Sequence, residues 1–214
     1  MPLIQDTSDF WIRKAILSFP TVITPKSINN GAPKFSASFI IDPRSEDWAL
    51  LMDRVTQIAH EKWADQAVPI MNMIANDKRM RAYGAGTEKV SQSTGLPYAG
   101  YSADNVYINA ITDTKPQLIG TNGQPLAPTE ENLKMVGGNV VSAIVRPWAQ
   151  QNEHGKAIRC QLVAVQYLEE GEHFGHAEVD ATSVFQPVAG APAAAAGAMP
   201  PMPGMNTGTA DPLG

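Results

Sequence analysis

The 214-residue sequence lacks the features of several protein classes. Its single cysteine, Cys160, excludes an internal disulfide framework and a cysteine-rich zinc site, and it fits a reducing compartment. No apolar run approaches the roughly 18 residues that a membrane helix needs. The first residues also lack the basic start and apolar stretch of a secretory signal. We therefore expect a cytoplasmic protein that spans no membrane and has one folded domain with appendages.

Positive charge is missing from the end of the chain. All 16 Lys and Arg residues lie between Phe10 and Cys160, together with 13 Asp and Glu residues, whereas six acids and no Lys or Arg follow Cys160. A mildly basic body with an acidic end favours contact with nucleic acid and a competing tail, even though the formal net charge is −5. Chance variation of surface charge explains the asymmetry equally well.

Enzyme motifs are also scarce. No G-x-S-x-G, P-loop or dinucleotide fingerprint occurs, and we expect no cofactor and no metal. Asp113-Thr114-Lys115, with Asp104 upstream, has the Asp-x-Lys form in which a carboxylate holds a divalent ion and a lysine steadies the transition state. No helix bearing a glutamate stands just ahead of it. A divalent-metal nuclease is therefore kept as the alternative to a protein without catalytic activity.

Most of the sequence has the pattern of β-strands. Phe35, Ala37, Phe39 and Ile41 alternate with polar residues, which is typical of a half-buried strand. A helix is expected after Ser45, its N-cap, because apolar residues recur at helical spacing from Trp48 to Trp63. The pattern predicts a small barrel or sandwich of about five strands. The other strands are expected at Trp11–Phe19, Tyr107–Thr112, Asn139–Val145 and Lys156–Leu168, the last two as a hairpin.

The composition changes after Phe185, where Ala, Pro, Gly and Met dominate and Asp211 is the only charged residue. Such a segment cannot bury enough apolar surface to offset the entropy of ordering it. We expect a flexible N-terminus over residues 1–9, a folded domain over residues 10–180 and a disordered tail over residues 181–214.

Aromatic residues stand beside cations at several points of the folded part. Binding of single strands needs cations along the phosphates and aromatic planes for the bases, each stacked base contributing roughly 1–3 kcal/mol. Because proline cannot donate to a sheet ladder, Trp148 is expected at a strand end or edge, within reach of a ligand. The pairings in the sequence are Lys34-Phe35, the run from Lys78 to Tyr83, Tyr107 with Lys115, and Arg146-Pro147-Trp148.

The order of these pieces resembles the OB-fold single-stranded DNA-binding proteins of tailed phages. The resemblance is carried by ITPKSINNGAPKFSASFII, PYAGYSADNVYINAITDTKP and GGNVVSAIV. It implies a five-stranded OB-fold barrel with one inserted helix, and binding of single-stranded DNA without strong sequence preference. It also implies a role in phage DNA replication or recombination, in the cytoplasm of the infected bacterial host. A purely structural phage protein without affinity for nucleic acid is a third possibility.

The predicted DNA-binding residues combine these patterns with the resemblance. The turn PYAGY is expected to bring two tyrosines to the mouth of a groove, whereas Tyr107 either stacks on a base or packs in the core. The acidic region after Leu168 is expected to compete with DNA for the groove or to recruit phage replication proteins. The full predicted set is Lys26, Lys34, Lys78, Arg79, Arg81, Tyr83, Tyr98, Tyr101, Tyr107, Lys115, Arg146 and Trp148.

Overall fold

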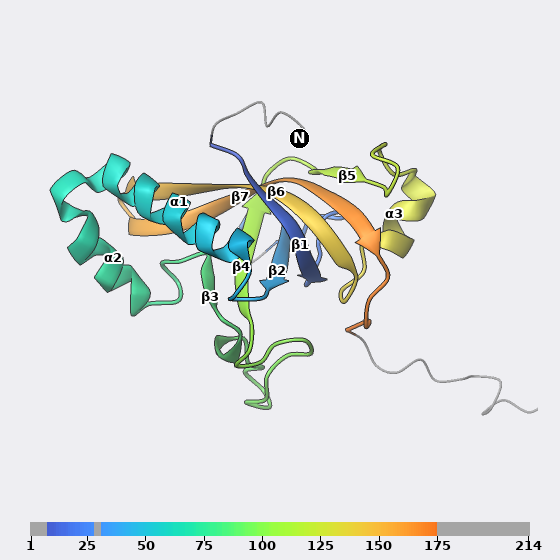
Figure 1. Cartoon of the computed structure of the whole chain (residues 1–214), viewed down its shortest axis with the longest axis horizontal. Coiled ribbons are helices and arrows are strands. Elements are labelled where there is room, and N and C mark those ends of the chain that lie inside the picture. The colour runs from blue at the N-terminus through green and yellow to red at the C-terminus, as the bar shows by residue number, and fades with distance from the viewer. Residues whose placement is uncertain (1–7, 28–30, 175–214) are drawn as a thin grey trace, which may run out of the picture. The chain divides into compact units, whose positions relative to one another are not determined.

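Seven strands form one sheet in the computed structural model of the chain, which describes residues 8–27 and 31–174 (Figure 1). They are β1 (Phe10–Ser18), β2 (Phe35–Ile41), β3 (Tyr83–Ala85), β4 (Val106–Thr112), β5 (Gln117–Ile119), β6 (Val140–Asn152) and β7 (Gly155–Glu169). Residues 1–7, the predicted tail over residues 181–214, and Glu178 and Asp180 of the acidic region lie outside the described residues. Within the described part, no helix is long and apolar enough to cross a membrane.

Five of the strands pair in a closed circuit. The strand β1 lies antiparallel to β2 and β6, β2 lies antiparallel to β4, and β6 lies antiparallel to β7. The circuit closes between β4 and β7, which run parallel and meet at Ile111 and Gln161. The two short strands extend this arrangement, with β3 on β4 and β5 on β7. The predicted strands are confirmed, and the chain is mainly β-sheet.

The interior follows from the alternation of the strands. The apolar face of β2 is buried through Ala37, Phe39 and Ile41, and it packs in one cluster with fully buried residues of the other strands, among them Ile12 and Leu162. The opposite face of β2 is not wholly open to solvent either. Ile40 is only 3% exposed because the segment between β3 and β4 folds back and lays Tyr101 against it.

One long helix, α1 (Glu46–Trp63), begins where the sequence predicts it. Ser45 is the N-cap, and its hydroxyl accepts a hydrogen bond of 3.2 Å from the backbone N–H of Trp48. Two short helices, α2 (Ala67–Ala75) and α3 (Pro128–Lys134), were not predicted. The sequence of α2 is apolar on nearly every side and shows no helical period, and α3 ends a loop rich in proline and glycine residues. Single 3-10 turns occupy Ala64–Gln66 and Gly86–Glu88.

The helices α1 and α2 cover one face of the β6–β7 hairpin (Figure 1). Ile158 of β7 is 1% exposed and packs in a cluster with Val55, Trp63 and Ile74 from the two helices. Trp63 therefore lies in the core, as its place in the helical stripe predicts. Because apolar packing fixes this face of the hairpin against the helices, the other face is free to carry polar and aromatic side chains.

Candidate nucleic-acid interface

The β6–β7 hairpin sets Trp148 beside Arg159. A two-residue turn at Glu153 and His154 pairs Asn152 with Gly155, and the ladder continues without a break until Trp148 stands opposite Arg159. Directly paired residues of an antiparallel ladder share a face of the sheet. Both side chains therefore lie on the face that the helices leave uncovered. The indole of Trp148 is 43% exposed.

The sequence analysis predicted that Trp148 lies at a strand end or edge, and in the structure it lies inside β6 rather than at its end. It is nevertheless at an edge, because β1 pairs with β6 only up to Val145, opposite Phe10. Beyond that point β6 has a single neighbour, β7. The lack of a backbone N–H at Pro147 therefore costs no ladder bond on the open side.

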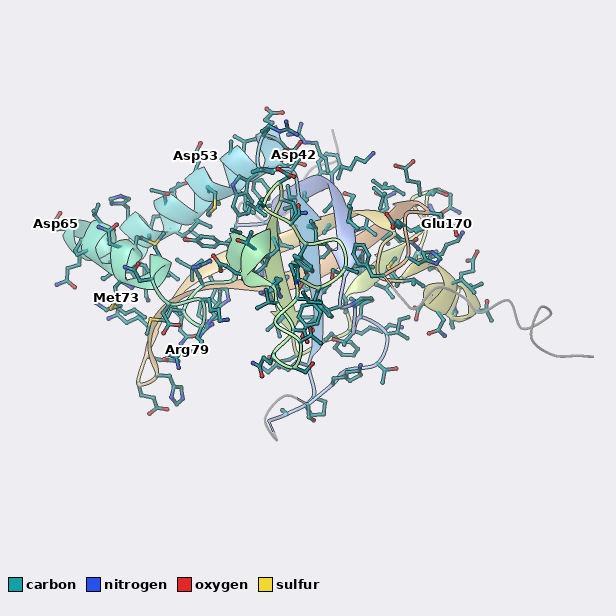
Figure 2. All side chains as sticks on the ribbon, turned by 90° about the horizontal axis from the view of Figure 1, so that it is seen from below. Asp42, Asp53, Asp65, Met73, Arg79 and Glu170 are labelled. Carbon is teal, nitrogen blue, oxygen red and sulfur yellow. The ribbon has the colours of Figure 1, made fainter. Side chains whose placement is uncertain are left out.

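A basic segment between α2 and β3 is anchored to the same hairpin. The Asp77 carboxylate accepts hydrogen bonds from the backbone N–H and the guanidinium of Arg79, which lower the pKa of Asp77 to about 2. The carbonyl oxygen of Met80 accepts a 2.8 Å bond from the N–H of Ile158, and that of Arg79 accepts one of 2.8 Å from the Arg159 guanidinium. Figure 2 shows Arg79 beside the hairpin.

These elements enclose a groove of about 830 Å³. Its walls come from the end of the loop before β2, the basic segment, the end of β4 and the hairpin. Ile111 of β4 adds an exposed apolar surface, being 42% exposed. Among the described residues, five cationic side chains and one acid, Asp113, line the groove, so their summed charge is positive in a chain whose net charge is negative. The cations are Lys34, Lys78, Arg79, Arg81 and Arg159.

The cations of the groove are held by polar partners to different degrees. Lys34 pairs with Asp113 at 3.0 Å, and Arg81, whose side chain is 11% exposed, pairs with Glu88 at 2.9 Å. Arg159 donates to the side-chain oxygen of Gln150, a neutral partner. Within the described residues, Lys78 makes no ion pair. The exposed cations can exchange these partners for phosphate oxygens. Arg81 is mostly buried and instead holds the groove wall together through its hydrogen bonds to Glu88 and to the carbonyl oxygen of Tyr83.

Five of the predicted DNA-binding residues thus meet in one groove: Lys34, Lys78, Arg79, Arg81 and Trp148. Three others lie elsewhere and are held by acids or rings. Lys115 binds both carboxylate oxygens of Glu131 at 2.7 and 2.8 Å, Arg146 donates to Asp9 at 2.7 Å, and Tyr83 lies edge-on to Trp48. Lys26 lines a separate, smaller hollow, although its backbone bridges to that of Lys34.

The remaining three predicted residues, all tyrosines, gather on the outer face of β2 and β4. Tyr101 and Tyr107 are 5% and 4% exposed and meet edge-on at 6.0 Å, so neither presents a free ring face in this structure. Tyr98 is 39% exposed. Lys89 lies over the Tyr107 ring, with its Nζ 4.5 Å from the centroid, and burial lowers the pKa of this lysine.

Sequence reasoning missed Arg159, Ile111 and Lys89. The turn in QQNEHG contained the signal for Arg159, since counting back along a two-residue hairpin pairs it with Trp148. The alternation of β4 placed Ile111 on the outer face, but it did not show that this end of the face is open. Lys89 lies in an irregular segment, and nothing in the local sequence indicates that it folds onto β4.

The residues of the Asp-x-Lys pattern diverge in the structure. Asp113 pairs with Lys34, whereas Lys115 binds Glu131. In the part of the chain that the structure describes, no three His, Cys, Asp or Glu side chains come together in a group suited to a metal ion. The arrangement of this pattern therefore gives no support to a metal-dependent nuclease.

The structure combines a strand-rich sheet with a groove that is lined by cations and by the ring of Trp148. The model of the family of the single-stranded DNA-binding protein of Enterobacter phage Enc34 matches residues 9–195, and the chain belongs to this family. No curated protein matches the sequence.

Solved structures share the fold. The single-stranded DNA-binding protein from bacteriophage Enc34, in complex with ssDNA, is similar with a TM-score of 0.63 and 20% identity over 79% of this chain and 91% of that chain. A second structure of the same Enc34 protein has a TM-score of 0.61 and 19% identity over 85% of this chain and 92% of that chain. Gp2.5, a single-stranded DNA-binding protein encoded by bacteriophage T7, gives 0.51 and 12% over 83% and 94%.

Proposed function

We propose that the chain binds single-stranded DNA in the groove between β4 and the β6–β7 hairpin, and that it coats and protects exposed strands during phage DNA replication or recombination. The observation that carries this proposal is the meeting of five cationic side chains with the exposed Trp148 in one groove. Membership of the Enc34 family supports the choice of single-stranded DNA as the ligand. The site of action is then the cytoplasm of the infected host.

The order of strand pairing supports an OB-fold barrel as the finer description of the sheet. The circuit β1–β2–β4–β7–β6–β1 is the order in which the five strands of that fold close, with a parallel contact between its third and fifth strands. OB folds bind oligonucleotides on the face of their second and third strands and on the loops beside it. Here those strands are β2 and β4, and the groove lies at their end.

The groove suits a ligand whose sequence varies. Exposed cations contact phosphates, which every nucleotide has, and an indole stacks on the flat face of any base. Neutral hydrogen-bonding side chains also line the groove, but the contacts of cations with phosphates and of the indole with base faces do not depend on which base is present. These neutral residues are Asn109, Thr112, Thr114, Gln150 and Gln161. We therefore expect affinity for single strands with little preference for sequence, and no chemical change of the bound strand.

A gel-shift experiment with labelled oligothymidylate, matching duplex and magnesium or manganese tests this function. We expect a shifted single strand of unchanged length, and affinity that falls steeply as salt rises because bound phosphates release counterions. If the parent chain cleaved the strand and the Lys115→Gln variant did not, the result would favour the nuclease instead. Affinity that stays the same between low and high salt would contradict a cationic groove.

The acidic region after β7 is proposed to compete with DNA or to recruit phage replication proteins. Its first acid, Glu169, pairs with Lys14 at 3.1 Å and ends β7, eight residues beyond Gln161 of the groove. Glu178 and Asp180 lie outside the described residues. The identity of any protein partner stays a prediction from sequence.

A further inference from the structure

Phe19 and Tyr98 form an exposed aromatic pair outside the groove. Their ring centroids lie 4.9 Å apart and the planes meet at 83°, an edge-to-face contact. Phe19 is 47% exposed and Tyr98 is 39% exposed, although each ring would stabilise the protein more if it were buried. The Phe19 ring is also stacked with that of the buried Tyr101 at 6.2 Å, so a ligand can reach only the exposed parts of Phe19 and Tyr98.

The backbone holds Phe19 in a conformation that phenylalanine disfavours. Its φ is 46°, in the left-handed region that asparagine and glycine adopt at lower cost. Such backbone strain in a bulky residue persists where the surrounding structure fixes it, and it collects at sites of function. Phe19 follows the end of β1 directly, so the strained residue is anchored to the sheet.

Lys89, which has no counter-ion among the residues that the structure describes, lies beside the aromatic pair. The Nζ of Lys89 is 5.6 Å from the centroid of the Phe19 ring, and it donates a 2.9 Å hydrogen bond to Oδ1 of Asn109. Of the ion pairs within residues 8–27 and 31–174, none includes Lys89. A half-buried cation in this position gains from an anion that approaches from solvent, and phosphate is one.

The lysine also connects the pair to the groove. Asn109, which accepts from Lys89, lines the groove as well. Asn109 therefore contacts Lys89 and also borders the groove, so only this residue lies between the two. A strand that leaves the groove past Asn109 meets Lys89, which lies over the buried Tyr107, and then the two rings.

We infer that Phe19, Tyr98 and Lys89 form a second base-stacking site for single-stranded DNA, which extends the path of the strand beyond the groove. The inference rests on the proposed function. It assigns the stacking to Phe19 and Tyr98 and the phosphate contact to Lys89. It also predicts that the second site contributes only when the strand is long enough to reach it.

The test compares the Phe19→Asn variant with the parent chain on oligothymidylates of about 5 and about 16 nucleotides, lengths within the range that single OB folds occupy. Asparagine removes the ring and tolerates the positive φ, so the fold is retained. We expect affinity for the short strand to stay within about twofold and affinity for the long strand to fall roughly tenfold, the loss of one stacked base. The Phe19→Tyr variant keeps an aromatic ring and should bind the long strand as tightly as the parent chain does.

Two further variants complete the design. Leu133→Asn removes a side chain that is 71% exposed on α3, and it should change neither affinity. Tyr98→Ser should reproduce the effect of Phe19→Asn independently. Unchanged binding of the long strand by both ring variants would overturn the second site and leave the proposed function standing. An equal loss on both lengths would place the rings in the primary contact and would also overturn it. If the parent bound neither strand, the proposed function itself would fail.

Discussion

The Trp148→Ala variant is expected to bind oligothymidylate about 5- to 150-fold more weakly than the parent, which corresponds to about 1–3 kcal/mol for one stacked base. Trp148 supplies the one aromatic ring among the residues that line the groove. Its indole is 43% exposed and stands opposite Arg159, so a base on the ring brings its phosphate near a guanidinium. Titration by fluorescence anisotropy with a labelled strand measures the change.

The controls separate stacking from packing. Trp148→Phe keeps a flat ring and should recover most of the affinity, whereas Leu133→Ala removes an exposed apolar side chain from α3 and should have no effect. Because Trp148 is 43% exposed and belongs to none of the core clusters of the described residues, the variant should remain folded, which thermal unfolding checks. Full affinity in a folded Trp148→Ala variant would remove the ring from the binding site.

Neutralising two groove arginines is expected to flatten the salt dependence of binding. Each phosphate that a protein neutralises on a single strand contributes about −0.7 to the slope of log affinity against log salt. The Arg79→Gln/Arg159→Gln variant should therefore have a slope smaller by about 1.4, and weaker binding at low salt, if each arginine contacts one phosphate. Titrations at four or more salt concentrations give the slope.

Arg44 provides a matched control for Arg79. Both side chains are 86% exposed, and each pairs with an aspartate two residues earlier in the chain, Asp42 or Asp77. Arg79 lines the groove and Arg44 does not. Arg44→Gln should leave the slope unchanged. Equal slopes for the parent and the double variant would show that the groove arginines meet no phosphate.

The sequence predicts the local elements well because their signals are local. The alternation in Phe35–Ile41 and the helical stripe after Ser45 each report which side of one element is buried. The helix α2 escapes this reasoning because its apolar residues lie all around it. Its burial comes from α1 and from Ile158 of β7, a residue more than 80 positions later in the chain.

The tyrosines show where sequence reasoning stops. The alternation of β4 placed Tyr107, Asn109 and Ile111 on one face, and the pairing of β4 with β2 agrees. That face is closed at Tyr107 and open at Ile111, because the segment before β4 folds back over one end only. Which end is covered depends on a long-range contact, which a periodic pattern cannot encode.

The sequence indicates which residues are cationic and near aromatic residues, but not which of them come together in one groove. The run from Lys78 to Arg81 indicated a basic segment, yet its position depends on backbone bonds to Ile158 and on the hairpin register. Lys115 has the same appearance in the sequence, but Glu131 of α3 holds it. Neighbouring acids that are distant in the chain therefore decide which lysines remain available for phosphate.

Photo-cross-linking of oligothymidylate to the full chain, followed by mass spectrometry of the peptides, tests the central claim most directly. We expect cross-links in the β6–β7 hairpin at Trp148 and in the basic segment around Arg79, and we expect them to disappear as salt rises. Cross-links confined to α1 and α3, with none in the hairpin, would contradict the groove as the site of DNA binding.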